Sequence, residues 1–231
     1  MKSNFYLRFE EMINYKKILL ISSLLIVFTL ISGNLTHAIE PEDNNTIELN
    51  SDSQENEVVE ISFLDYNYFE DQINPGITAT INQVGDSNNA LINQVGQNNY
   101  AWLIQAGDEN TSNISQIGNN NDGYLTQIGE ENKADIIQDN YTGYRSGFIG
   151  QLGDNNEAKI KQEGFLNLAA IGQFGDENKA HILQTDDDEK ESIIMQNGDN
   201  NTAGIMALDQ SKNLAVEQHG DNQNIEILIG E

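Results

Sequence analysis

The sequence contains no cysteine and only two prolines in 231 residues. The absence of cysteine excludes a disulfide framework, a thiolate nucleophile and a cysteine-based zinc site. Basic residues are also scarce, with 11 Lys and Arg against 37 Asp and Glu, for a formal charge of −26. A chain this acidic has no basic patch to neutralise phosphates, which argues against nucleic-acid binding. Hydrophobic residues make up 38% of the chain, below the roughly 45–50% usual in globular proteins.

Amide side chains are what the sequence has in excess. Asn occurs 32 times and Gln 17 times, so these two residue types account for about a fifth of the chain. A chain with so few apolar residues and so many amides needs a means of burying surface other than a conventional hydrophobic core.

The N-terminal region has the organisation of a secretory signal peptide. An almost unbroken apolar run covers residues 18–31, Lys16 and Lys17 precede it, and small or polar residues follow as far as Ala38. The run is 14 residues long, which is short for a membrane span of about 20. We therefore predict that residues 1–38 are a signal peptide removed after Ala38, with a retained membrane anchor as the alternative and Met12 as a second candidate start.

Residues 39–70 form a separate acidic segment that contains no Lys or Arg. Charge runs of this kind are usually disordered, so the segment is predicted to be a disordered leader or secretion-targeting segment. A short strand or recognition segment around Val58, Val59, Ile61, Phe63 and Leu64 is the alternative.

From about residue 71 the chain repeats with a period of 11 residues. The repeat is marked by glutamine, which fills 12 of 13 slots, with one step of 13, one of 12 and Ala207 in the remaining slot. Self-similarity at a fixed period indicates a repeat architecture. The glutamines in the slots are Gln83, Gln94, Gln105, Gln116, Gln127, Gln138, Gln151, Gln162, Gln173, Gln184, Gln196 and Gln218.

Other positions keep the same register. An aliphatic residue stands two before every slot: Ile81, Ile92, Leu103, Ile114, Leu125, Ile136, Ile149, Ile160, Ile171, Ile182, Ile194, Ile205 and Val216. Glycine stands two after most slots: Gly85, Gly96, Gly107, Gly118, Gly129, Gly153, Gly164, Gly175, Gly198 and Gly220. Asparagine stands five after most slots: Asn88, Asn99, Asn110, Asn121, Asn132, Asn156, Asn167, Asn178 and Asn201. Alanine is frequent seven after the slot, so the unit is A-x-I-x-Q-x-G-x-x-N-x.

The spacing within the unit predicts its shape. Ala, Ile and Gln are two residues apart, and side chains two apart on a strand share a face, so A-x-I-x-Q is a short strand. Gly allows a positive φ and the following Asn bonds its own backbone or accepts a left-handed conformation, which makes a corner. Two strands and two corners total 22 residues, one coil of an all-β solenoid. Stacked coils align Ile on Ile and the amides in ladders at about 4.7–4.8 Å, as in cross-β amyloid.

The regular pattern weakens in five places. Pro75 interrupts the register upstream, and Ile227 and Ile229 suggest a degenerate last strand at the C-terminal end. Between them, residues 140–147, 185–191 and 206–212 depart from the unit and are predicted to be bulged loops. The solenoid is therefore assigned to residues 71–231.

The unit Q-x-G-x-x-N-x-A-x-I-x-Q resembles the curlin repeat of curli, the secreted amyloid fibres of Gram-negative bacteria. Residues 171–184 are a close match, and the similarity covers about residues 80–229. In that family the aligned amides are associated with stacking, and the resemblance carries this role to Gln83, Asn88, Gln94, Asn99, Gln173, Asn178 and Gln184. Ser does not stand regularly six before Gln, and both half-repeats look alike, so the rank of the subunit stays open: major subunit, nucleator or paralogue.

The resemblance implies a secreted structural subunit of an extracellular fibre at the cell surface, serving biofilm matrix and adhesion. Its implied partners are other copies, other curlin-like subunits and a dedicated outer-membrane secretion pore, which reads an N-terminal segment in the place of residues 39–70. No nucleic acid, small-molecule substrate, cofactor or metal is expected.

Other functions were weighed against this one. An enzyme needs a nucleophile–base pair, paired acids in a cleft or a metal centre, and His181 and His219 occupy variable repeat positions. A non-polymerising solenoid adhesin with capped ends is the serious alternative. Calcium is conceivable at the recurring Gly-Asp-x-Asn turns, although calcium β-rolls have a nine-residue period and turn chemistry explains the motif. An ice-binding face would need a flat Thr array, which the variable positions lack.

Overall fold

The computed structural model describes residues 46–50, 57–63, 77–140, 143–185, 189–208 and 213–230. The chain divides into two units, residues 1–33 and 34–231, and every described residue belongs to the second unit. The predicted signal peptide, residues 1–38, lies outside the described residues. Within them no helix is long and apolar enough to cross a membrane.

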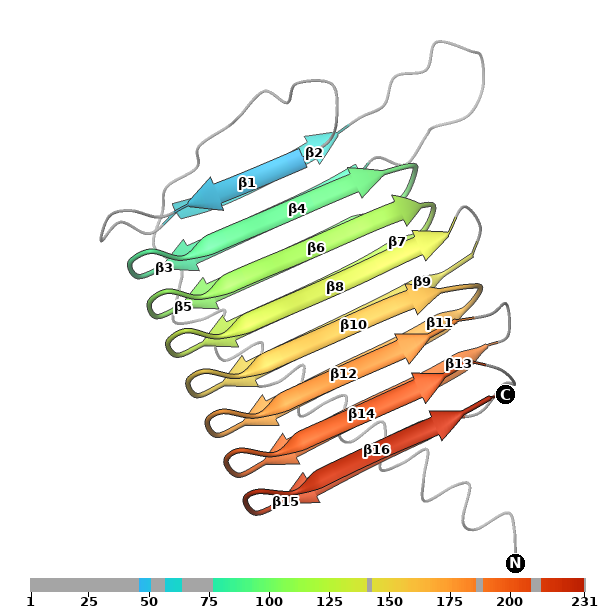
Figure 1. Cartoon of the computed structure of the whole chain (residues 1–231). Helices are drawn as coiled ribbons and strands as arrows, with labels where there is room; N and C mark the ends of the chain where they lie inside the picture. The colour runs from blue at the N-terminus through green and yellow to red at the C-terminus, as the bar shows by residue number, and fades with distance from the viewer. Residues whose placement is uncertain are drawn as a thin grey trace, which may run out of the picture. The chain divides into compact units, whose positions relative to one another are not determined.

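Every element in the described part of the chain is a β-strand (Figure 1). The strands are β1 (Thr46–Asn50), β2 (Glu57–Phe63), β3 (Ile77–Val84), β4 (Asn89–Val95), β5 (Tyr100–Ala106), β6 (Thr111–Gly118), β7 (Asn121–Ile128), β8 (Lys133–Asn140), β9 (Arg145–Leu152), β10 (Glu157–Glu163), β11 (Asn167–Phe174), β12 (Lys179–Gln184), β13 (Lys190–Asn197), β14 (Thr202–Ala207), β15 (Leu214–His219) and β16 (Asn224–Ile229).

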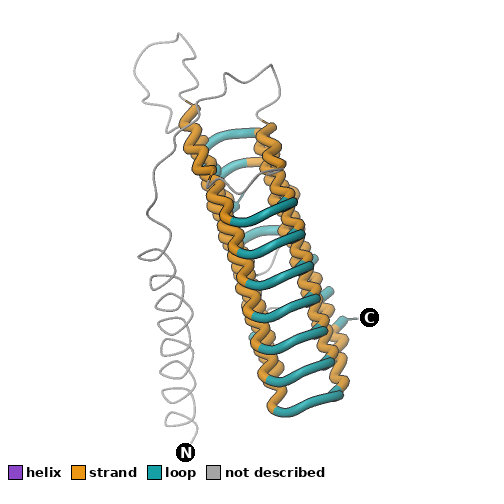
Figure 2. Tube along the Cα trace, turned by 90° about the vertical axis from the view of Figure 1, so that its left-hand side faces the viewer, coloured by secondary structure: helices purple, strands orange, loops and turns teal. Residues whose placement is uncertain are grey.

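Consecutive strands from β3 onward alternate between two sheets. One sheet, here the odd sheet, has the order β15-β13-β11-β9-β7-β5-β3-β2, and the even sheet has the order β1-β4-β6-β8-β10-β12-β14-β16. Figure 2 shows the two sheets facing each other and joined level by level through short loops. One odd and one even strand make one coil, so the predicted all-β solenoid of two-strand coils is confirmed.

Strand pairing is parallel from β3 to β16, and it aligns equivalent repeat positions. In the odd sheet Ile171 pairs in register with Ile149 and Ile194, and in the even sheet Ile160 pairs with Ile136 and Ile182. Because the side-chain period of a strand is two, this register sends the same unit positions inward in every coil.

The interior between the sheets is built from the Ala, aliphatic and Gln positions of the unit. All thirteen aliphatic residues two before the slots are buried, and Ala79, Ala90, Ala101 and their equivalents fill the narrower part beside them. The alternation of buried and partly exposed residues along each strand follows the period of two. A narrow interior of this kind needs few hydrophobic residues per coil, which accounts for the low hydrophobic content.

The corners follow a fixed backbone conformation. Gly85 has φ +114°, and a Cβ added there would lie 2.1 Å from the carbonyl oxygen of Gly107 in the next coil, so only glycine fits. The residue before the Asn is also left-handed, with φ near +57° at Ser87, Glu109 and their equivalents. Of the two roles that the sequence left open for the Asn, the structure gives it the backbone hydrogen bond, and the left-handed conformation belongs to the residue before it.

The three predicted bulged loops prove shorter than expected. Strand β8 runs to Asn140 and β9 begins at Arg145, so residues 145–147 belong to a strand rather than to a loop. Likewise β13 begins at Lys190, and β14 continues to Ala207. Strand pairing with the coils on either side extends the regular structure into these departures from the repeat.

Two strands precede the repeats, in the segment expected to be a disordered leader. Strand β2 pairs antiparallel with β3, and β1 pairs antiparallel with β4. The register places Val59 opposite Ile81 and Ile47 opposite Ile92, so aliphatic residues stand at the positions that continue the interior. The segment predicted to be a disordered leader thus contains two strands, and β2 covers Val58, Val59, Ile61 and Phe63 of the short strand that was the alternative.

Candidate functional site

The glutamines of the odd sheet form one continuous hydrogen-bonded ladder. The Nε2 of each glutamine donates to the Oε1 of the glutamine in the next coil, from Gln83 through to Gln218, with N···O distances of 2.6–2.9 Å. From Gln105 to Gln218, the Nε2 also donates to a backbone carbonyl of the even sheet, as from Gln173 to Glu157 at 3.1 Å. Each of these carboxamides therefore joins neighbouring coils and also ties the two sheets together.

The even sheet carries a second glutamine ladder that is shorter. It runs from Gln94 through Gln116, Gln138 and Gln162 to Gln184, with distances of 2.6–3.0 Å. The next slot holds Ala207, so Gln184 donates instead to Ser192 Oγ at 3.0 Å and to the carbonyl of Leu168 at 2.9 Å. The even ladder thus ends inside the solenoid, whereas the odd ladder reaches its last strand.

The corner asparagines form a ladder of opposite direction. Beside the even sheet, the backbone N–H and the Nδ2 of Asn110 both donate to Oδ1 of Asn88 in the preceding coil, at 3.0 and 3.1 Å. The same pattern repeats at Asn132, Asn156 and Asn178. A second Nδ2 hydrogen goes forward to a corner carbonyl, as from Asn110 to Gly129 at 2.7 Å. These amides are fully buried, so each bond is made away from water.

At the opposite corner two cations replace asparagine. The column there contains Asn99, Asn121, Arg145, Asn167 and Lys190. Arg145 is fully buried and donates to Asn121 Oδ1 at 2.6 Å and to the Gly164 carbonyl at 2.7 Å, and the buried Lys190 donates to the Thr185 carbonyl. The position five residues after Gln138 or Gln184, where the unit has Asn, does not contain either cation because extra residues are inserted in these loops. The same position counted six residues back from Gln151 or Gln196 is Arg145 or Lys190.

The carboxylates of the Gly-Asp-x-Asn turns stack along the corners. Asp108 Oδ1 accepts the backbone N–H of Asp86 at 2.8 Å, and Asp176 accepts that of Asp154 at 2.8 Å. These oxygens are thus engaged with the backbone of the neighbouring coil. Among the described residues, no group of three or more His, Asp or Glu is placed to hold a metal ion. The geometry gives the motif a role in corner stacking.

The two ends of the stack are chemically different. At the N-terminal end Gln83 Oε1 and Gln94 Oε1 are buried, and no donor from the described residues reaches them. At the C-terminal end Gln218 closes the odd ladder, and no described strand pairs beyond β15 or β16. Three isoleucines of β16, Ile225, Ile227 and Ile229, continue the columns of Ala203, Ile205 and Ala207 but are partly or largely exposed. One end therefore offers acceptors and the other an uncovered apolar edge.

Comparison with known proteins gives one match. The family model for the curlin-associated repeat matches residues 77–107, 107–139 and 147–185. Comparison with curated proteins and with solved structures finds no match.

Proposed function

The chain belongs to the family of curlin-repeat proteins, and on this basis we propose that it is a secreted subunit of curli-like extracellular fibres. In this proposal the subunits stack end to end at the cell surface and contribute to biofilm matrix and adhesion. The repeat family and the solenoid are structural rather than enzymatic.

The observation that carries the proposal is the complementarity of the two ends. Gln83 begins the odd ladder with an unsatisfied acceptor. Gln218 ends the same ladder with an Nε2 that donates one hydrogen to the Thr202 carbonyl and has a second one to donate. A second copy stacked on the N-terminal end would place its Gln218 one coil before Gln83. The ladder would then run on without a break, and the unpaired backbone groups of both edges would be satisfied.

The N-terminal strands bear on how this junction forms. Strands β1 and β2 occupy the edge that an incoming coil would need, so they must leave when a subunit is added there. While β2 pairs with β3, no donor from the described residues reaches the Gln83 oxygen. A parallel coil carrying Gln218 supplies that donor, and we infer that exchange of the cap for a second copy is favourable.

A non-polymerising adhesin remains the second candidate, and one observation favours it. An adhesin of this kind would have capped ends, and β1 and β2 cover the N-terminal end with antiparallel strands. The Gln218 carboxamide at the C-terminal end favours the fibre instead, because it can donate to the Gln83 oxygen of a second copy.

The test is polymerisation of the chain from residue 39 onward. Fibres with diffraction reflections near 4.7 and 10 Å are expected, the spacings of strands and of packed sheets. A chain that stays a folded monomer at high concentration, with or without preformed seeds, would favour the adhesin and refute the fibre.

Secretion follows from the same proposal and has its own test. Residues 1–38 would direct export across the inner membrane, and residues 39–70 would be read by an outer-membrane pore of the curli type. Fusing residues 1–70 to a reporter in a host with such a pore should place the reporter outside the cell. Release that is unchanged when residues 39–70 are deleted would contradict the targeting role.

A further inference from the structure

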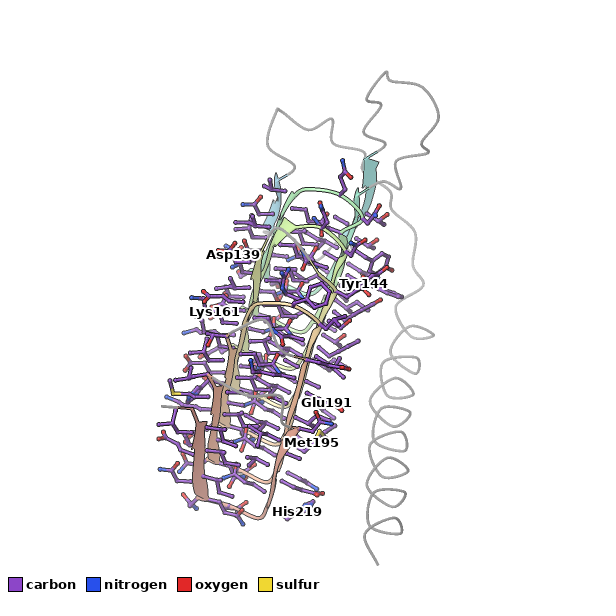
Figure 3. All side chains as sticks on the ribbon, turned by 90° about the vertical axis from the view of Figure 1, so that its right-hand side faces the viewer. Asp139, Tyr144, Lys161, Glu191, Met195 and His219 are labelled. Carbon is purple, nitrogen blue, oxygen red and sulfur yellow. The ribbon has the colours of Figure 1, made fainter. Side chains whose placement is uncertain are left out.

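The outer side of the middle of the even sheet differs in charge from that of the first five repeat strands of the odd sheet. On the even sheet, strands β8, β10 and β12 present Lys133, Asp135, Asp139, Glu157, Lys159, Lys161, Glu163 and Lys179 to the outside. On the odd sheet, the outward residues of β3, β5, β7, β9 and β11 include one charge, Asp122. Figure 3 shows Asp139 and Lys161 projecting on one side of the stack and Met195 on the other.

We call the uncharged surface the apolar face. Its outward columns are read from the strand register. They are Thr78, Tyr100, Asp122, Ser146 and Leu168; Thr80, Trp102, Tyr124, Phe148 and Ala170; Asn82, Ile104, Thr126, Gly150 and Gly172; and Val84, Ala106, Ile128, Leu152 and Phe174. The columns hold aromatic, aliphatic and small residues on neighbouring strands of one sheet.

Side chains on the apolar face already shield one another from water. The Tyr124 and Phe148 rings stack with centroids 4.9 Å apart and planes within 2°, and the Tyr100 and Tyr124 rings lie 5.4 Å apart. Ile104 points outward yet is only 3% exposed. Burial raises the pKa of the Asp122 carboxyl and, with the Asp122 charge, raises the pKa of Tyr124 to about 12. Apart from Asp122, the outward residues of β3, β5, β7, β9 and β11 carry no charge that a partner would have to desolvate.

The ring geometry indicates what kind of partner fits. The stacked rings use their faces on each other along the column, so they turn edges rather than faces outward. A flat polysaccharide surface would stack on exposed ring faces. Ring edges and aliphatic side chains instead suit the water-free packing of one β-sheet on another.

We propose that the apolar face packs against the apolar face of a second copy, so that two stacks run side by side in one fibre. The proposal rests on the fibre proposed above. A second copy is the partner whose strands have the same spacing, about 4.8 Å, so the strands of the two faces can stay aligned at successive levels. The outward residues of β3 to β11 on the odd sheet bring a single charge, Asp122, into such a contact, which keeps its electrostatic cost small for a chain of charge −26.

The area explains why pairing belongs to the fibre and not to the monomer. Five strands about 4.8 Å apart and about seven residues long give a face of roughly 24 by 23 Å, so pairing buries roughly 1,100 Å² in total. That is near the lower limit of about 1,000 Å² for a specific interface. In a fibre each added subunit repeats the contact, so many weak contacts act together.

The experiment uses fibres of the secreted chain and measures their mass per length by electron microscopy. The test substitution is Leu152→Asp on the apolar face, and the matched control is Val95→Asp on the even sheet. Both residues follow a ladder glutamine directly, and their exposures are 47% and 49%. A second pair, Trp102→Asp and Leu91→Asp, compares the same unit position on the two sheets.

Wild-type and control fibres should have twice the mass per length of a single stack, and Leu152→Asp and Trp102→Asp fibres should have half the wild-type value. All of them should keep the 4.7 Å reflection. Single-stack wild-type fibres, or an equal loss in test and control variants, would overturn the pairing alone. Single stacks that bind insoluble polysaccharide through Trp102 would also overturn it, by assigning the face to another partner. An absence of fibres in the wild type would refute the proposed function itself.

Discussion

The glutamine ladder makes a graded prediction for the stability of the monomer. Gln173 takes part in three hydrogen bonds: it accepts from Gln151, donates to Gln196 and donates to the Glu157 carbonyl, at 2.8, 2.8 and 3.1 Å. At about 1 kcal/mol net for each bond, Gln173→Ala should lower the free energy of unfolding by about 3 kcal/mol. The cavity left in the interior adds to this loss. A domain of this kind has about 5–15 kcal/mol in total, so the loss is large.

Gln94 provides the intermediate case. It makes two hydrogen bonds, to Gln116 Oε1 and to the Thr78 carbonyl, and its own Oε1 is buried without a donor among the described residues. Gln94→Ala loses about 2 kcal/mol of bonding; it removes one buried acceptor without a donor but leaves Gln116 Oε1 in that state, so the net loss should be about 2 kcal/mol. The neighbouring Asn93 points outward, and Asn93→Ala should change stability by less than about 0.5 kcal/mol.

The assay is urea unfolding of freshly prepared monomer, followed by the fluorescence of Trp102, the single tryptophan. Gln173→Ala should destabilise the monomer most, Gln94→Ala less and Asn93→Ala least. The lag before fibre formation should likewise be longest for Gln173→Ala and shortest for Asn93→Ala. Equal unfolding free energies for the Gln173 and Asn93 variants would refute the ladder as a source of stability and the assignment of the two strand faces.

Three further predictions concern the cap, one carboxylate and the overall charge. Deleting residues 46–63 should shorten the lag of fibre formation because the N-terminal edge opens; a longer lag would show that β1 and β2 help the chain to fold. Burial raises the pKa of Asp122 above 3.8, so its contribution to stability is fully present below pH 3.8 and is lost as the pH rises through the raised value. Asp122→Asn should therefore raise the melting temperature at pH 7 and not at pH 3, and an equal shift at both would contradict this. Added salt or mild acid should speed fibre growth, since both weaken repulsion between stacked carboxylates, and a growth rate indifferent to both would count against that repulsion.

Most of the solenoid follows from the period of the sequence. The spacing of two between Ala, Ile and Gln determines which side chains share a face of a strand. The period of 11 places equivalent residues on the two facing sheets, where both point into the interior. The glycines locate the corners for the same reason, since only a residue without a Cβ fits beneath the next coil at Gly85.

The parts that could not be predicted depend on contacts between coils. Arg145 and Lys190 take the place of asparagine because their side chains reach the same carbonyl groups, and the pattern of residue types does not reveal this. Glu109 and Leu166 adopt a left-handed φ because the corner demands it, against their own preference. Strands β1 and β2 lie outside the repeat; the sequence indicated a short strand near β2 as an alternative, but the antiparallel pairing with β4 and β3 depends on tertiary contacts.

The opposite directions of the amide ladders have a consequence for fibre length. The glutamine carboxamides point their oxygens toward the N-terminal end, and the corner asparagines point theirs toward the C-terminal end. Their dipoles oppose each other, and the backbone of a sheet contributes a small net dipole. An α-helix of growing length gathers partial charge at its two ends. A stack of this protein adds dipoles that largely cancel, so lengthening it builds up little electrostatic penalty at its tips.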